Sequence, residues 1–111
     1  MFQVLEISIY VVELLAPIEA RIRRVNRPLA DQISRASESV VLNLGESRGR
    51  CDGDRRRHFE FATGSAEEVT VALRIARAKR YASAEELAPV EAALDRVRAM
   101  LYRLRHPRVN A

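Results

Sequence analysis

Apolar residues recur at alternating intervals of three and four positions over most of this sequence, which restricts the chain to helices that share a core. Residues with this spacing lie on one face of an α-helix and form an apolar stripe, here called a seam. One seam comprises Leu87, Val90, Leu94, Val97, Leu101 and Leu104. Another comprises Phe59, Ala62, Ala66, Val69, Leu73 and Ala76. A third comprises Ile33, Ala36, Val40, Asn43 and Ser47. These seams predict three long helices.

The N-terminal segment predicts a fourth helix, but its apolar residues are not confined to one seam. The spacing favours Phe2, Leu5, Ile9, Val12, Ala16, Ile22 and Val25. Other faces hold Val4, Ile7, Val11, Leu14 and Leu15. A bundle core needs less apolar surface than this from one helix, so we expect part of it to meet a partner molecule. Glu6 and Glu13 interrupt the segment and no basic stretch precedes it. It therefore fits neither a membrane span nor a signal peptide, and we expect a cytoplasmic protein without a membrane partner.

Short breaks with helix-stop and helix-start signals separate the predicted helices. Residues 26–28 (Asn-Arg-Pro) end the first helix and start the second, with proline near the first turn. Residues 49–53 read as a loop with Asp54 as the next N-cap, and Ser83 with Glu86 fits a capping box. Connections this short force neighbouring helices to be antiparallel. The sequence therefore predicts an all-α, antiparallel up-down-up-down four-helix bundle that forms a single domain over residues 1–111.

The chain has nineteen basic and fifteen acidic residues, a net charge of +4, and eighteen of the basic residues are arginine. An antiparallel bundle gathers basic residues at both ends around an acidic middle, and we expect the set at the end formed by the second loop and the C-terminus to contact phosphate, which guanidinium groups suit. This set comprises Arg48, Arg50, Arg55, Arg56, Arg57, Arg103, Arg105 and Arg108. Two plainer explanations stay open: a GC-rich genome favours Arg over Lys, and basic residues near helix C-termini complement the helix dipole. Residues 55–57 lie near a helix N-terminus, where the dipole disfavours cations, so the dipole does not account for them.

No residue pattern indicates a metal, a cofactor or a catalytic group. The Glu-x-x-His pairs of di-iron bundles are missing from the sequence, since arginine stands three positions before each histidine. Cys51, Asp52, Asp54 and His58 match no standard metal site. No third group orients Cys51 and His58 as a nucleophile and base. We therefore expect a non-enzymatic protein without cofactors.

Two residues are unusual for their positions in the predicted helices. Asn43 occupies a seam, where a buried amide is expected to fix register or oligomeric state. Gly64 stands in mid-helix, where it lowers helix propensity. We expect Gly64 to allow a close crossing against small residues of the second helix.

Two motifs in the middle of the chain carry a family resemblance. The first reads Gln-Ile-Ser-Arg-Ala over 32–36 and Ser-Val-Val-Leu-Asn-Leu-Gly-Glu over 39–46. The second comprises Phe59, Ala62, Gly64-Ser65-Ala66 and Glu67 or Glu68. Over about residues 28–81 the chain resembles the family of four-helix bundle proteins named after reading frames in 23S rRNA intervening sequences.

The resemblance implies a left-handed antiparallel bundle that assembles as a homopentamer, in a family without established enzymatic activity. A similar protein, the accessory variability determinant of diversity-generating retroelements, is a basic pentamer that works with a reverse transcriptase and RNA. We therefore expect a homo-oligomer that contacts RNA or DNA backbone through its arginine-rich end. The alternative is an oligomeric scaffold or adaptor whose partner is a protein, such as a reverse transcriptase.

Overall fold

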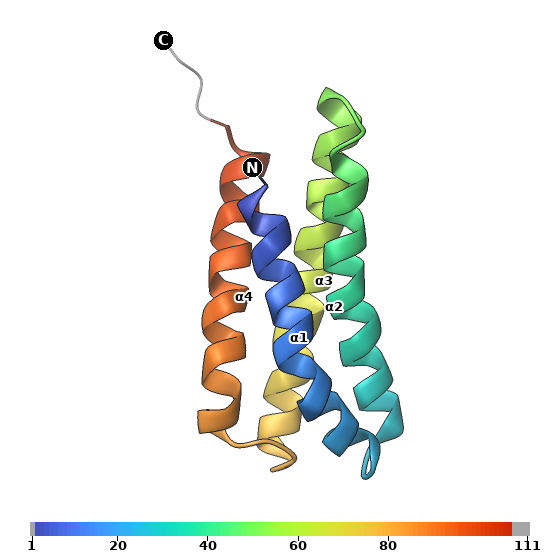
Figure 1. Ribbon diagram of the computed structural model, residues 1–111, viewed down its shortest axis with the longest axis vertical. Coiled ribbons are helices and arrows are strands. Elements are labelled where there is room, and N and C mark those ends of the chain that lie inside the picture. The colour runs from blue at the N-terminus through green and yellow to red at the C-terminus, as the bar shows by residue number, and fades with distance from the viewer. Residues whose placement is uncertain (1, 108–111) are drawn as a thin grey trace.

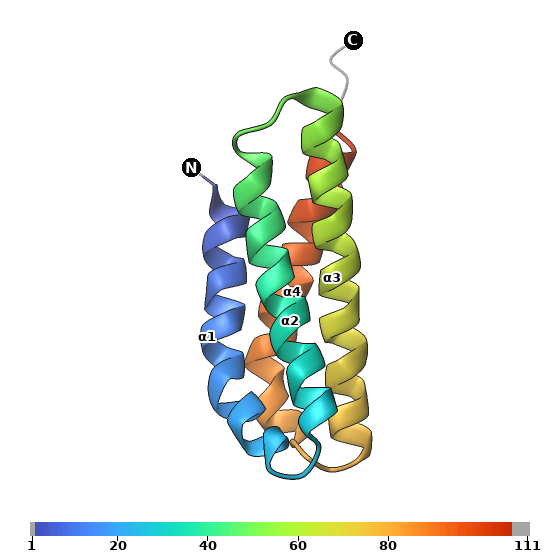
Figure 2. The same ribbon diagram turned by 90° about the vertical axis from the view of Figure 1, so that its right-hand side faces the viewer.

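Helices account for all the regular secondary structure in the computed structural model, which describes residues 2–107. They are α1 (Gln3–Arg23), α2 (Arg27–Ser47), α3 (Asp52–Ala78) and α4 (Ala84–Arg105). The helices run alternately up and down along one long axis (Figure 1, Figure 2). Each packs against the next, and α4 closes back on α1. The predicted all-α, antiparallel four-helix bundle is confirmed.

The seams predicted for α2, α3 and α4 form most of the core. Every member of the α3 seam is buried, from Phe59 through Ala76. The α4 seam is buried from Leu87 to Leu101, but its last member, Leu104, is 36% exposed. In α2 the seam is buried except for Asn43, which is half-buried. Because each large apolar side chain contributes about 1.5–3 kcal/mol on burial, these three seams hold the bundle together.

The seam predicted for α1 is wrong, because this helix buries a different face. Its buried residues are Val4, Ser8, Val11, Leu15, Ile18 and Ile22. Of the predicted seam only Ile22 is buried, whereas Ile9 is 39% and Val25 is 65% exposed. The buried face was missed because it contains a polar residue, Ser8. The short Ser8 side chain fits into the core, and its hydroxyl donates a hydrogen bond to the Leu5 carbonyl at 2.8 Å. Apolar residues cover so much of α1 that spacing alone left two stripes to choose from.

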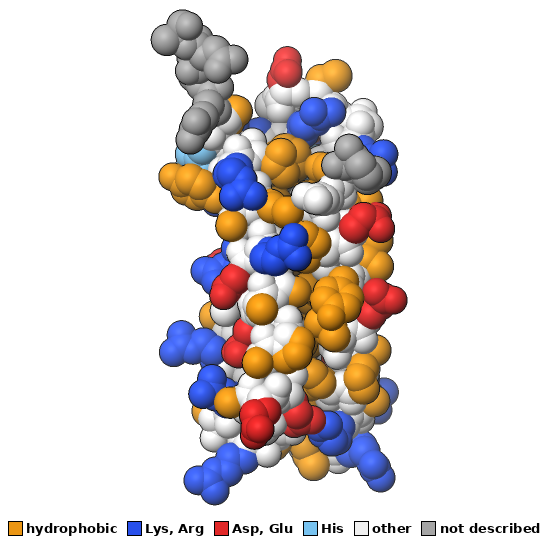
Figure 3. All heavy atoms as spheres, turned by 60° about the vertical axis from the view of Figure 1, so that its left-hand side comes forward, with side chains coloured by type: hydrophobic (Ala, Val, Ile, Leu, Met, Phe, Trp, Pro, Cys, Tyr) orange, Lys and Arg blue, Asp and Glu red, His pale blue; other side chains and the backbone are white. Residues whose placement is uncertain are grey.

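The remaining apolar residues of α1 lie at its borders or face outward. Leu5, Ile7 and Leu14 are half-buried against the core, and Ile9 and Tyr10 are exposed. Hydrophobic side chains extend along this side of the molecule between charged ones (Figure 3). Packing within the bundle thus covers much of the apolar surface of α1, and the exposed part that remains is the smaller patch at Ile9 and Tyr10. Among residues 2–107, no helix combines the length and hydropathy that a membrane crossing requires.

The starts of α2 and α4 follow the predicted capping signals. The Asn26 side-chain oxygen accepts a hydrogen bond from the Leu29 N–H at 3.1 Å. At α4 the Ser83 hydroxyl accepts from the Glu86 N–H at 3.1 Å, and the Glu86 carboxylate accepts from the Ser83 N–H at 3.0 Å. This reciprocal pair is the expected capping box.

The start of α3 differs from the prediction. The helix begins at Asp52, with Cys51 at the N-cap position and no hydrogen bond from the Cys51 side chain. Asp54 therefore lies in the first turn, where its charge complements the helix dipole, and is not the N-cap. Its carboxylate pairs with Arg50 and Arg57. The Asp54 carboxylate therefore forms ion pairs with neighbouring arginines and does not cap the helix.

Gly64 does not mark a close helix crossing, so that expectation is wrong. The residue is exposed on α3, and no neighbouring atom lies within 4 Å of the place that a Cβ would occupy. Small residues of α2 and α3 do meet elsewhere, at Ser39 and Ser65, whose hydroxyl oxygens lie 2.9 Å apart.

A ladder of polar side chains, here called the polar ladder, joins α2 to α3 at Asn43. The Asn43 amide nitrogen donates to the Ser39 carbonyl at 2.9 Å and to the Ser39 hydroxyl at 3.2 Å. The amide oxygen therefore faces His58, whose Nδ1 lies 3.0 Å away and acts as the donor. The Ser65 hydroxyl donates to the Ser39 hydroxyl at 2.9 Å. Asn43 thus pairs two helices of one chain and orients the His58 ring, for which the sequence analysis found no orienting group.

Candidate nucleic-acid interface at the arginine-rich end

One end of the bundle brings together the start of α1, the end of α2, the start of α3 and the end of α4. The α2–α3 hairpin extends beyond the ends of α1 and α4, so residues 48–51 overhang the core (Figure 1, Figure 2). We call this the arginine-rich end. All but one of the arginines predicted to contact nucleic acid lie here, and the remaining one, Arg108, lies outside the described residues.

Two of the predicted arginines are held in ion pairs with nearby carboxylates. Arg50 contacts Glu46 at 2.7 Å and Asp54 at 3.3 Å, and Arg57 contacts Asp54 at 2.6 Å. The hydrogen bond from Arg50 lowers the pKa of Glu46, so this carboxylate stays ionised beside the guanidinium group. These contacts compensate the charge of Arg50 and Arg57, which are therefore less available to an outside anion.

Arg48 and Arg55 border a hollow of about 480 Å³ at this end, here called the main hollow. It is lined by Phe2, Ser47, Arg48, Arg55, Phe59 and Leu104. The Arg48 guanidinium carbon lies 5.8 Å from the centroid of the Phe2 ring, within the range of a cation–π contact. The Arg55 Nε donates to the Ser47 carbonyl at 3.2 Å, which uses one of the five donors of that guanidinium group.

A second hollow, of about 340 Å³, adjoins the main one through shared lining residues. Arg55, Phe59 and Leu104 line both hollows, and Arg56 and Pro107 border the second one. The ion pairs within residues 2–107 involve none of Arg48, Arg55 and Arg56. The two hollows therefore share an apolar floor bordered by arginines that form no ion pair within residues 2–107, with Asp52 as a carboxylate at the border of the second hollow.

The floor of the main hollow is the open end of the bundle core, and the sequence analysis missed it as a site. Phe2, Ser47, Phe59 and Leu104 are the terminal members of the predicted seams of α1, α2, α3 and α4. In an antiparallel bundle these four termini meet at one end. The signal was present in the sequence for α1 and α4, because Phe2 and Leu104 end their seams at a helix terminus and are left partly exposed, whereas Ser47 and Phe59 are buried.

The two arginines of α4 that were predicted to contact nucleic acid are arranged differently from each other. Arg103 is exposed, whereas Arg105 is half-buried with its guanidinium carbon 5.9 Å from the centroid of the Tyr102 ring. Tyr102 in turn stacks on His106 with ring centroids 4.1 Å apart. Arg105 is therefore held against its own helix, and Arg103 is the one directed to solvent.

The electrostatics of this end favour an anionic partner only moderately. Between residues 46 and 57 five arginines face three carboxylates, and Arg103 and Arg105 add further positive charge. Asp52 and Asp54 occupy the first turn of α3 and offset the charge of residues 55–57. The positive potential is thus concentrated where the arginines lack a carboxylate partner, at the rim of the hollows.

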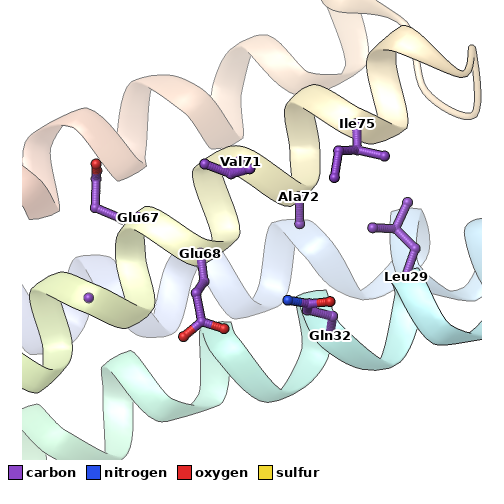
Figure 4. A pocket seen from close by; sticks show the side chains of 8 residues that line it. Leu29, Gln32, Glu67, Glu68, Val71, Ala72 and Ile75 are labelled. Atoms are coloured by element: carbon purple, nitrogen blue, oxygen red, sulfur yellow. The ribbon is translucent and has the colours of Figure 1, made fainter.

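A separate groove of about 300 Å³ lies along the side of the bundle between α2 and α3. Leu29 and Gln32 of α2 face Glu68, Ala72 and Ile75 of α3 across it (Figure 4). The groove has an apolar part at Leu29 and Ile75 and an acidic part at Glu68. It offers no cationic group to a phosphate.

An exposed apolar stripe on α3 borders this groove. Phe61, Val71 and Ile75 are 52%, 54% and 41% exposed. Gly64 lies three positions after Phe61, with the same seam-like spacing, so this exposed glycine belongs to the stripe. We call Phe61, Gly64, Val71 and Ile75 the α3 outer stripe; the exposed Glu68 occupies the position between Gly64 and Val71 and interrupts the apolar surface there.

Comparisons with known proteins place the chain in a family. The family model described as 23S rRNA-intervening sequence protein matches residues 5–103. A crystal structure of a protein with unknown function from the S23 ribosomal protein family of Bacteroides thetaiotaomicron superposes with a TM-score of 0.85 at 15% identity, and the match covers 93% of this chain and 98% of that chain. At this identity the likeness shows the fold alone. Among curated proteins, none matches. Because the family match spans nearly the whole chain, the chain belongs to the 23S rRNA-intervening sequence protein family.

Proposed function

We propose that this protein is a non-enzymatic bundle that contacts the phosphate backbone of RNA or DNA through its arginine-rich end. One observation carries the proposal: Arg48, Arg55 and Arg56 border the adjoining hollows, and none of them takes part in an ion pair within residues 2–107. Guanidinium groups present forked donors that match phosphate oxygens. Arg103 extends the same basic surface along α4.

Binding of this kind depends on salt and tolerates many sequences. Arginines that neutralise phosphates release condensed counterions, and the gain in entropy shrinks as the salt concentration rises. Backbone contacts carry no base information directly. We therefore expect weak, sequence-tolerant binding at each site.

We further propose that the chain assembles as a homo-oligomer, the homopentamer that the family resemblance implies. Ile9 and Tyr10 on α1 and the α3 outer stripe are exposed apolar surfaces. The helices α1 and α3 lie diagonally across the bundle, because each packs on α2 and α4. Contact between two different faces of successive copies produces a ring when the rotation closes. A ring would repeat the arginine-rich end, and the sites would add through avidity.

The direct test compares two variants that lose the same charge at opposite ends of the bundle. The first combines Arg48→Gln, Arg55→Gln and Arg56→Gln. The control combines Arg24→Gln, Arg27→Gln and Arg77→Gln, three exposed positions at the other end. Fluorescence anisotropy with a labelled single-stranded RNA of about 12 nucleotides measures the affinity at low salt.

The first variant is expected to bind at least about tenfold more weakly than the wild type, and the control to bind nearly as well. Equal losses in the two variants would show that net charge alone governs binding and would overturn the placement of the site. Circular dichroism confirms that both variants keep their helices.

A second candidate function is a scaffold whose partner is a protein such as a reverse transcriptase. The α3 outer stripe favours it, since exposed apolar residues at seam spacing suit a partner helix. Co-purification of a partner that survives nuclease treatment and is lost on Val71→Glu would support this role. Loss of the partner on nuclease treatment would contradict it.

A further inference from the structure

We infer that the main hollow accepts an unpaired nucleobase, so that the ligand of the arginine-rich end is single-stranded nucleic acid. The inference rests on the proposed function, because the rim arginines would hold the phosphates. It adds the class of ligand, which phosphate contact alone does not define.

The floor of the hollow has the chemistry of a stacking surface. The aromatic part of this surface is the half-buried Phe2 ring, which packs on the buried Phe59 ring with ring centroids 6.5 Å apart and an angle of 46° between the ring planes. Leu104 completes the apolar surface and is 36% exposed. Apolar and aromatic side chains of this kind receive bases from single strands without regard to sequence, because every base has a flat aromatic face. The volume of about 480 Å³ falls within the range of small-molecule sites.

The rim of the hollow has the chemistry of a phosphate clamp. The Arg48 side chain is exposed and places its guanidinium carbon 5.8 Å from the centroid of the Phe2 ring, at the border of the floor. The hydrogen bond from the Arg55 Nε to the Ser47 carbonyl fixes the plane of that guanidinium group and leaves its other donors for a ligand. A nucleotide joins a flat aromatic ring with polar edges to an anion, and this hollow joins an apolar floor to the guanidinium groups of Arg48 and Arg55.

The adjoining hollow provides a path for the next nucleotide. Arg55 lines both hollows, and Arg56 borders the second one next to Phe59 and Leu104. A strand whose base occupies the main hollow would bring its following phosphate toward Arg56. A duplex cannot use this floor, since its bases are stacked and paired inside the helix while the phosphates face outward.

The experiment compares three ligands of equal length on the full chain. They are a single-stranded RNA of about 12 nucleotides, an abasic phosphodiester strand with the same number of phosphates, and the RNA annealed to its complement. Competition against the labelled single strand gives the affinities. We expect the single strand to bind about tenfold more tightly than the abasic strand.

A spectroscopic readout reports on the hollow itself. The chain has no tryptophan, so Phe2→Trp places a single indole at the floor while keeping an aromatic ring under Arg48. Stacking of a base on the indole is expected to quench its emission. Tyr81→Trp, in the α3–α4 connection at the other end of the bundle, is the matched control and should keep its emission.

The outcomes separate the inference from the proposed function. Preference for the base-bearing strand together with quenching at position 2 supports the inference. Equal binding of all three ligands without quenching overturns it and leaves phosphate contact standing. Binding to none of the three overturns the proposed function, and the inference falls with it.

Discussion

Arg80 is one of two non-glycine residues within residues 2–107 that have a positive φ, the other being Asp52. The φ of 63° at Arg80 lies in the left-handed region directly after α3. The Tyr81 N–H donates to the Ala76 carbonyl at 2.8 Å, and the Arg80 N–H donates to the Arg77 carbonyl at 3.0 Å. These are the two hydrogen bonds of a Schellman motif, in which glycine usually occupies the left-handed position.

Arg80→Gly is expected to raise the free energy of unfolding by about 0.5–1 kcal/mol, because glycine adopts this conformation without a Cβ clash. Arg77→Gly removes the same charge one turn earlier, inside α3, and should lower the free energy of unfolding by about 1 kcal/mol. Urea unfolding at a fixed protein concentration measures both. Effects of the same sign would show that the charge, and not φ, determines the result.

Glu19 is half-buried on α1 beside α2, and its environment makes ionisation less favourable. Burial raises the pKa of Glu19, and the hydrogen bond with Ser34 and the charge of Arg23 offset part of that rise. The folded state therefore binds this proton more strongly than the unfolded chain does. The contribution of Glu19 to stability increases as the pH falls through its folded pKa toward the ordinary value of 4.5.

Glu19→Gln is expected to raise the free energy of unfolding at pH 7, because no charge is then buried. Its advantage over the wild type should shrink as the pH falls toward 4.5. Glu13→Gln, at an exposed position of the same helix, is the control. A difference between Glu19→Gln and the wild type that is constant with pH would contradict this account.

At the scale of the helix, the sequence predicts an element well when one face is apolar and the others are polar. The seams of α3 and α4 have this character, and their buried faces agree with the prediction except at Leu104. α1 is apolar on several faces and buries Ser8, so spacing could not choose its inner face. The face of α1 that packs inward is selected by the side chains of α2 and α4 that it must fit against. Such packing between helices cannot be read from the sequence of α1 alone.

The polar ladder gives a prediction about how α2 and α3 are held together. Asn43→Ala removes the acceptor of His58 and a donor to Ser39, and it is expected to lower the free energy of unfolding by about 1–2 kcal/mol. Leu42→Ala alters the neighbouring position, which is 68% exposed, and should change stability by no more than about 0.5 kcal/mol. Chemical denaturation measures both. If Asn43→Ala left the free energy of unfolding unchanged, the polar ladder would not stabilise this helix pair.

At the scale of the whole molecule, the composition of the site was predictable and its shape was not. The excess of arginine and the antiparallel topology placed basic residues at both ends, and the arginines predicted to contact nucleic acid at one of them. Which arginines pair with carboxylates depends on side-chain positions around the α2–α3 turn, where Arg50 and Arg57 meet Asp54. The main hollow is formed by residues of all four helices, which are far apart in the sequence. A pattern within one helix therefore could not predict it.

The proposed homopentamer predicts the mass of the particle in solution. Light scattering is expected to give about five times the chain mass of 12.6 kDa. Val71→Glu should lower the mass, because it places a carboxylate in the α3 outer stripe. Val25→Glu makes the same change at a position that is 65% exposed outside the stripe and should leave the mass unchanged. A monomeric wild type would contradict the proposed assembly.

The dependence of RNA affinity on salt tests the central claim, contact between the arginine-rich end and phosphate, most directly. The logarithm of the association constant is expected to fall linearly with the logarithm of the salt concentration. Replacing Arg48, Arg55 and Arg56 with glutamine should make that slope shallower by about 2, since about 0.7 counterions are released for each single-strand phosphate neutralised. The control with Arg24, Arg27 and Arg77 replaced should keep the slope of the wild type. Parallel lines for the wild type and the first variant would show that these three arginines do not contact phosphate.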